Sequence, residues 1–168
     1  MSLEFVDTNV LIYSHDTSAG AKRQRALELV RDLTSQDSGA LSVQVLSEFY
    51  WIATRKLSVA SSTAEEVISN FGAWTIHQPT HADILRAVDL HRKLKTSWWD
   101  ALILNSAIEL GCETLWTEDF HHGQRVSGVT VRNPFRLSRC TIGACATFSA
   151  AAFRTPPASC LLRADLAG

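Results

Sequence analysis

The chain has 168 residues, of which 46% are hydrophobic and 20% charged, with 16 Lys and Arg against 17 Asp and Glu. This composition excludes a disordered, collagen-like or disulfide-stabilised chain and predicts one globular domain, alone or with a short appendage. The sequence has neither an apolar run of the roughly 18 residues that a membrane span requires nor a secretory signal, so we expect a cytoplasmic protein without a membrane segment.

Short β-rich runs alternate with helical patterns up to residue 135. In chain order we expect a strand in LEFVDT, a helix at 21–35, a strand in GALSV, helices at 45–57 and 61–74, a strand in WTIHQP, a helix at 81–95, a helix that follows Ser97, and strands in ETLWT and GVTVRNP. Strands separated by helices pair in parallel through right-handed crossovers. The order therefore predicts an α/β fold with three layers, α/β/α, and a mostly parallel sheet of 4 to 5 strands.

Two further features refine this expectation. The helices at 45–57 and 61–74 have no strand between them and should pack as a pair. Three helix starts are indicated by Thr63, Thr80 and Ser97, because each has an acidic residue three positions later, as in a capping box. After residue 135 the composition shifts to alanine, cysteine and proline with little periodicity, so we predict a domain at 1–135 and a poorly ordered C-terminal extension at 136–168.

Four carboxylates fall where the predicted fold would bring them together. Asp7 ends the first strand, Glu48 lies at the border of the apolar stripe of its helix, Asp100 lies within the stripe of its own helix, and Asp119 follows the strand in ETLWT. Parallel sheets bind ligands at the carboxyl ends of their strands. Carboxylates that converge there raise one another's pKa unless a cation holds them ionised, and an all-oxygen donor set suits Mg²⁺ or Mn²⁺.

Each carboxylate also has a structural interpretation. Asp7 could cap a helix in NVLIY, Glu48 could lie on a solvated helix face, Asp100 could form the capping box with Ser97, and Asp119 could stabilise a turn. None of these interpretations explains why all four should meet at one edge of a sheet.

The residues around these carboxylates resemble the motifs of the PIN-domain ribonucleases, in particular the VapC-type toxins of toxin–antitoxin modules. FVDTNVLIY resembles the first motif, LSVQVLSEFY the second, SWWDALIL the third and LWTEDFHHGQ the fourth. The resemblance implies a metal-dependent endoribonuclease that hydrolyses RNA phosphodiester bonds with metal-activated water. Its catalytic and metal-binding residues would be Asp7, Glu48, Asp100 and Asp119, and Asn9 and Thr117 would support them.

The same resemblance implies partners, namely an RNA substrate, a cognate antitoxin and a second copy of the chain in a homodimer. Two alternative functions stay open: an RNA-processing nuclease without a toxin role, and a catalytically silent module on the same fold that binds RNA or protein. Candidate RNA contacts are a base stacked on Trp98 or Trp99, the pair His121 and His122, and basic residues at helix ends. The structural alternatives, which we favour, are packing for the tryptophans and simple solvation for the basic residues, namely Arg23, Arg25, Arg55, Lys56, Lys93 and Lys95.

Overall fold

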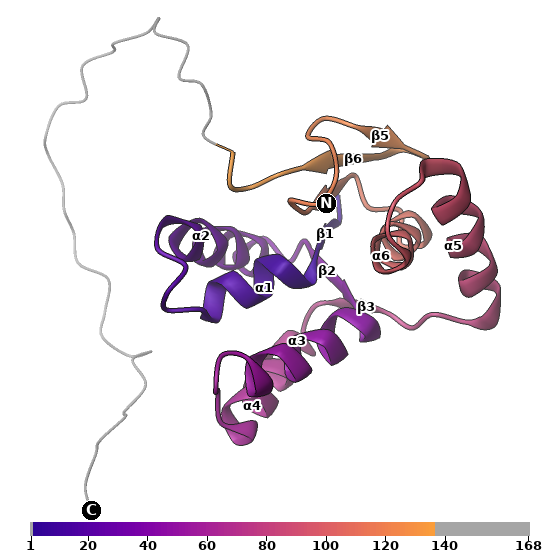
Figure 1. Cartoon of the computed structure of the whole chain (residues 1–168). Helices are drawn as coiled ribbons and strands as arrows, with labels where there is room; N and C mark the ends of the chain where they lie inside the picture. The colour runs from indigo at the N-terminus through magenta and orange to yellow at the C-terminus, as the bar shows by residue number, and fades with distance from the viewer. Residues whose placement is uncertain (1, 137–168) are drawn as a thin grey trace, which may run out of the picture. The chain divides into compact units, whose positions relative to one another are not determined.

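A computed structural model describes residues 2–136 (Figure 1), and the expected extension at 136–168 lies outside the described residues apart from Arg136. The elements are β1 (Glu4–Val6), α1 (Thr8–His15), α2 (Ala21–Ser35), β2 (Gly39–Ser42), α3 (Val43–Arg55), α4 (Ser61–Phe71), β3 (Thr75–His77), α5 (His81–Leu94), α6 (Trp98–Glu109), β4 (Thr114–Trp116), β5 (Arg125–Val126) and β6 (Val129–Arg132). They follow the predicted order with one added helix, α1, which the sequence indicated only as a helix that Asp7 could cap.

The strands form one sheet in the order β3-β2-β1-β4-β6-β5, and only the β5–β6 pair is antiparallel. The chain leaves β1 toward β2 and β3, and later returns on the other side of β1 with β4. The order in which strands are added therefore reverses between the parallel strands β1 and β4, which makes a crevice at their carboxyl ends the expected ligand site. Their register is fixed by the pair Val6 and Trp116.

Helices cover both faces of the sheet, which confirms the α/β fold. In Figure 1, α1 and α2 lie on one side and α5 and α6 on the other, while α3 and α4 pack together as the sequence predicted. The apolar residues of β1, β2 and β4 fill the core, where Phe5, Leu41 and Leu115 are fully buried. No helix within residues 2–136 is long and apolar enough to cross a membrane.

Two details differ from the sequence expectations. The helix start at Thr63 is wrong, because α4 begins at Ser61 with Ala60 as its N-cap and a backbone hydrogen bond from Ala64 to Ala60. The sheet also has a sixth, two-residue strand, β5, joined to β6 by Ser127 and Gly128. Both turn residues have positive φ, as two-residue hairpin turns require.

The other two predicted helix starts are present. Thr80 and Asp83 form a complete capping box at α5. Asp83 is buried and also accepts hydrogen bonds from Arg86, at 2.8 Å, and from Asn105 of α6, at 3.2 Å. The hydrogen bonds from Thr80, above all, hold the pKa of Asp83 well below its usual range. This buried carboxylate therefore ties α5 to α6.

Candidate active site

All four predicted carboxylates line one cleft of about 900 Å³ at the carboxyl ends of the parallel strands. Asp7 follows β1 directly and Asp119 comes three residues after β4, while Glu48 and Asp100 reach the cleft from α3 and α6. The cleft thus lies at the switch point, where the strand order reverses between β1 and β4. Its apolar walls include Ile12, Ile52, Leu57 and Ile103.

Asp7 is the most buried of the four, with 4% of its surface exposed. It occupies the N-cap position of α1, but its side chain makes no capping hydrogen bond, so the capping interpretation does not account for it. Burial raises its pKa from 3.8 to about 7. The hydrogen bond from the Thr117 hydroxyl, 2.5 Å long, opposes this rise, and the charges of Asp119 and Asp100 add to it.

Asn9 and Thr117 contact the carboxylates that they were predicted to support. The Asn9 amide donates a 2.8 Å hydrogen bond to Asp119, and Thr117 Oγ1 accepts one from the Asp119 backbone while donating to Asp7. Partial burial of its carboxyl raises the pKa of Asp119, as does the charge of Asp100. Two polar side chains therefore orient a pair of carboxylates whose charges repel.

Glu48 is half-buried and is held by two hydrogen bonds. Thr8 Oγ1 donates to one carboxylate oxygen at 2.7 Å, and the Gln44 amide donates to the other at 3.0 Å. The bond from Thr8 links α1 to α3 across 40 positions of sequence. Glu48 is therefore fixed in place rather than solvated on a helix face.

Asp100 lies in the first turn of α6, where the capping box is only half formed. Ser97 Oγ accepts a hydrogen bond from the Asp100 backbone amide, at 3.1 Å. The Asp100 carboxylate instead accepts a hydrogen bond from Thr96, at 3.2 Å, and faces the cleft. Capping thus uses the backbone of this residue and leaves the carboxylate available.

The donor chemistry of the cleft suits an oxygen-preferring divalent cation. Beside the carboxylates, the side-chain oxygens of Asn9 and Gln44 are buried and have no hydrogen-bond partner. Such orphaned acceptors are rare in folded proteins and fit a cation or its water ligands. No three His, Cys, Asp or Glu side chains among residues 2–136 lie close enough together to hold one ion as they stand. The carboxylates thus share a cleft without forming a preassembled metal cage.

Sequence reasoning missed a second group beside the cleft. Glu118 accepts hydrogen bonds from Tyr13 and from Lys22, both at 2.6 Å, and the Lys22 ammonium lies 4.4 Å from the centre of the Tyr13 ring. The charge of Lys22 opposes, without cancelling, the rise in the pKa of the neighbouring Asp119 that burial and the charge of Asp100 cause. The contact joins α1, α2 and the loop after β4, which no local sequence signal predicts.

The predicted basic residues separate into different surroundings. Lys56 lines the cleft, and Lys95 lines an adjoining cavity of about 560 Å³ that shares Asp100 and Asp119 with it. His121 lines this second cavity too, whereas His122 accepts a backbone hydrogen bond from Asn133. The other four basic residues lie elsewhere or are paired with carboxylates: Arg23, Arg25, Lys93 and Arg55, which is exposed in the last turn of α3.

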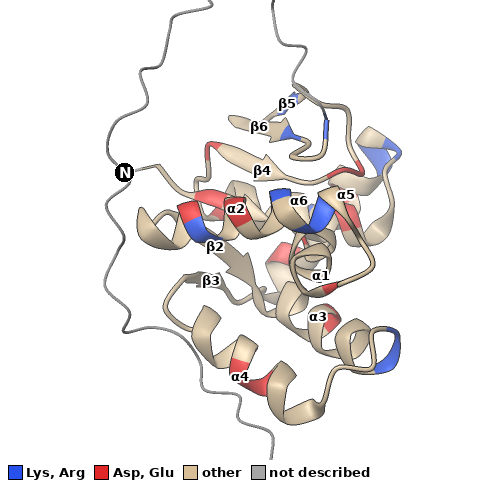
Figure 2. Ribbon diagram, turned by 90° about the vertical axis from the view of Figure 1, so that its left-hand side faces the viewer, with Lys and Arg blue, Asp and Glu red and all other residues tan. Residues whose placement is uncertain are grey.

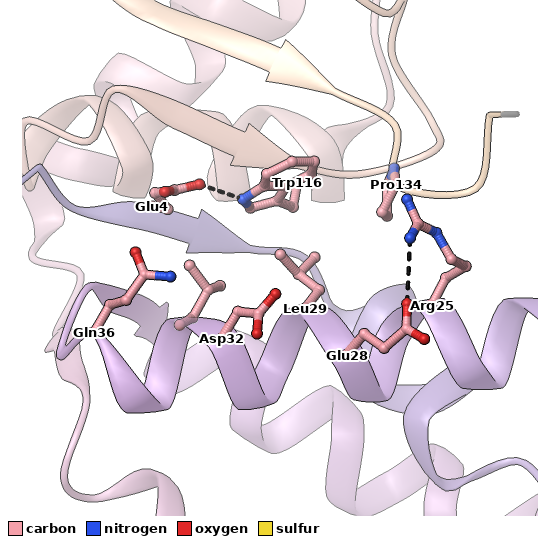
Figure 3. A pocket seen from close by; sticks show the side chains of 9 residues that line it. Glu4, Arg25, Glu28, Leu29, Asp32, Gln36, Trp116 and Pro134 are labelled. Atoms are coloured by element: carbon pink, nitrogen blue, oxygen red, sulfur yellow. Dashed lines mark hydrogen bonds and ion pairs between the residues drawn. The ribbon is translucent and has the colours of Figure 1, made fainter. Parts of the chain in front are cut away.

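Another cavity, of about 270 Å³, lies between α2 and β4 (Figure 3). Its polar groups are largely paired with one another, since the Trp116 indole donates to Glu4 at 2.6 Å and Arg25 contacts Glu28 at 3.2 Å. Figure 2 shows the same mixture of acidic and basic residues along α2. Of the predicted site residues, this cavity contains none of the four carboxylates and only Arg25 among the candidate RNA contacts.

The fold and the cleft together define a class of protein: an α/β domain with an acidic cleft at the switch point of a parallel sheet. The chain belongs to the PIN domain family, whose sequence model matches residues 5–125. None of the curated protein sequences compared with the chain shows a significant match.

Solved structures share the fold at low sequence identity. A toxin–antitoxin complex from Klebsiella pneumoniae is 23% identical, with a TM-score of 0.60, over 80% of this chain and 99% of that one. DNA-bound VapBC from Salmonella typhimurium is 18% identical, with a TM-score of 0.58, over 80% and 99%. The sarcin-ricin loop cleaving toxin VapC20 from Mycobacterium tuberculosis is 18% identical, with a TM-score of 0.52, over 66% and 85%.

Proposed function

We propose that the chain is a metal-dependent endoribonuclease that acts in the cytoplasm as the toxin of a toxin–antitoxin module. The observation that carries this proposal is the convergence of Asp7, Glu48, Asp100 and Asp119 on one cleft at the switch point of the sheet. Family membership and the likeness to toxin–antitoxin structures support it. Its partners would be RNA, a cognate antitoxin and a second copy of the chain.

The four carboxylates would hold Mg²⁺, or Mn²⁺ in its place, with Asp7 and Asp100 as the direct ligands. When bound, such an ion makes water more acidic and offsets negative charge on a phosphate. Asp7 would need to be ionised for this role, although burial favours its protonated form. The Thr117 hydroxyl stabilises the charged form by hydrogen bonding, and a cation nearby would do so more strongly.

The remaining residues would orient the carboxylates. Asn9 directs Asp119, and Thr8 with Gln44 directs Glu48, so each carboxylate at the rim of the cleft is held by an uncharged donor. Uncharged donors fix a carboxylate without neutralising it, which keeps the cleft attractive to a cation. Lys22 lies beside this group, paired with Glu118, and could face the phosphate backbone of a substrate.

The test compares purified full-length chain with Asp7→Asn and Asp100→Asn, using cleavage of total RNA in Mg²⁺. Asp89→Asn is the matched control, because Asp89 is an exposed carboxylate on α5 whose one ion-pair partner among residues 2–136 is Lys93. We expect cleavage by the unmodified chain and by the control, and loss of cleavage in the two cleft variants. Equal cleavage by all four proteins would overturn the proposed site.

The toxin role has a test of its own in growing bacteria. Expression of the chain should stop growth, and expression of Asp100→Asn to the same level should not. Undisturbed growth together with cleavage in the purified system would assign the chain to RNA processing instead.

A further inference from the structure

Two tryptophans are exposed in the acidic cleft itself. Trp51 on α3 is 57% exposed, and Trp99 on α6 is 58% exposed, and both line the cleft with the four carboxylates. The other three tryptophans have partners: Trp74 is buried against Phe71, Trp98 packs against His91, and Trp116 donates to Glu4. Exposure of two large aromatic rings in one concave site is unfavourable in water and indicates a ligand.

Each ring accompanies a carboxylate on the same helix. Trp51 follows Glu48 by three positions, so the two share a face of α3. Trp99 directly precedes Asp100 at the start of α6. The two helices thus each bring one carboxylate and one indole ring into the cleft. There the carboxylates can bind a phosphate through a cation, and the rings can stack on a flat, apolar group of the same ligand.

The side chain of Lys56 places a positive charge beside Trp51. The Lys56 ammonium lies 6.0 Å from the centre of the Trp51 ring and also lines the cleft. Within the described part of the chain, no carboxylate forms an ion pair with Lys56. Figure 2 shows basic residues where α3 ends and the turn toward α4 begins. An unpaired ammonium next to an exposed ring suits an anionic ligand that also carries an aromatic group.

We infer that Trp51 and Trp99 form a base-binding subsite, on which an unpaired nucleobase of single-stranded RNA stacks while Lys56 contacts the adjoining phosphate. A nucleotide joins a flat π-face to a phosphodiester in one unit, which matches the ring, cation and carboxylates of this cleft. Aromatic side chains bind single strands by stacking on their unpaired bases, whereas a base inside a duplex has no free face. The inference rests on the proposed nuclease function for the position of the scissile phosphate.

The experiment measures binding of a fluorescently labelled single-stranded RNA of mixed sequence to the full chain in Mg²⁺. All proteins carry Asp7→Asn, so that binding is read whether or not the unmodified chain cleaves RNA. Trp51→Ala and Trp99→Ala should each weaken binding about fivefold or more, and Trp51→Phe and Trp99→Phe should recover part of the loss. The matched duplex should bind with the same affinity in all variants.

The control is Leu85→Ala, since Leu85 is 59% exposed and lies on α5 away from the cleft. It should leave binding of the single strand unchanged. Unchanged affinity in both alanine variants would overturn the subsite. If light scattering then showed that the same variants have an altered oligomeric state, the two rings would be assigned to a protein interface. Ring-dependent binding without cleavage by the unmodified chain would instead refute the nuclease and leave the subsite standing.

Discussion

Replacing Asp7 by asparagine should stabilise the metal-free protein while removing its activity. Burial raises the pKa of Asp7 from 3.8 to about 7, so folding favours the protonated carboxyl. Each tenfold change in proton affinity corresponds to about 1.4 kcal/mol, and the full shift therefore destabilises the fold by about 4 kcal/mol well above pH 7. Asparagine has the same shape without the charge. Allowing for its own desolvation, we expect Asp7→Asn to gain about 2–4 kcal/mol at pH 7.5 in EDTA.

The sign of the pH dependence follows from the same pKa. Below 3.8 the carboxyl is protonated in both states and carries no penalty, and between 3.8 and about 7 the stability that protonation provides is lost as the pH rises. The advantage of Asp7→Asn should therefore shrink as the pH falls to 4. Thermal unfolding in EDTA measures it, and at pH 7.5 the melting temperature should rise by roughly 5–15 °C.

The exposed-carboxylate variant Asp89→Asn should show neither the gain nor its pH dependence. The reasoning is refuted if Asp7→Asn melts at or below the temperature of the unmodified chain at pH 7.5, or if the difference between them is the same at pH 4.

Three other substitutions test separate parts of the structure. Thr117→Val removes the hydrogen bonds to Asp7 and from the Asp119 backbone, and should slow single-turnover RNA cleavage roughly 10- to 100-fold and lower the free energy of unfolding by about 1–3 kcal/mol; unchanged cleavage would show that Thr117 does not orient Asp7. Asp83→Ala leaves the donors of Thr80 and Asn105 without their acceptor and should lower the free energy of unfolding in urea by about 2–4 kcal/mol, whereas a loss under 0.5 kcal/mol would contradict its role between α5 and α6. Gly39→Ala places a methyl group 2.3 Å from the Trp74 ring and should cost about 1–3 kcal/mol in the same assay, and adding Trp74→Leu should remove most of that loss.

The sequence predicted the fold where its signals are local. Alternation of short apolar runs with helical patterns was enough for the order of the elements other than α1 and β5 and for a mostly parallel sheet, and the carboxyl end of each strand then pointed to Asp7 and Asp119. The predicted start of α4 at Thr63 is wrong because a capping residue acts only where the extended backbone enters the helix. In α4 that position is Ala60. The β5 strand was missed although Ser127 and Gly128 carry a hairpin signal.

The contacts that shape the cleft could not be predicted in the same way. The bond from Thr8 to Glu48 and the group formed by Tyr13, Lys22 and Glu118 depend on how α1 packs against α2, α3 and the loop after β4. Such long-range contacts leave no periodic trace in the sequence. Trp51 is different: its spacing of three from Glu48 on one helix places it on the same face, so helical periodicity alone could have identified it.

The central claim is that the four carboxylates of the cleft cleave RNA with the help of a divalent cation. Its most direct test is cleavage of RNA by the purified full-length chain in Mg²⁺, after addition of excess EDTA, and after Mg²⁺ is restored beyond the chelator. We predict cleavage, then its loss, then its recovery. Undiminished cleavage in excess EDTA would contradict the account, because the proposed chemistry cannot proceed without the ion.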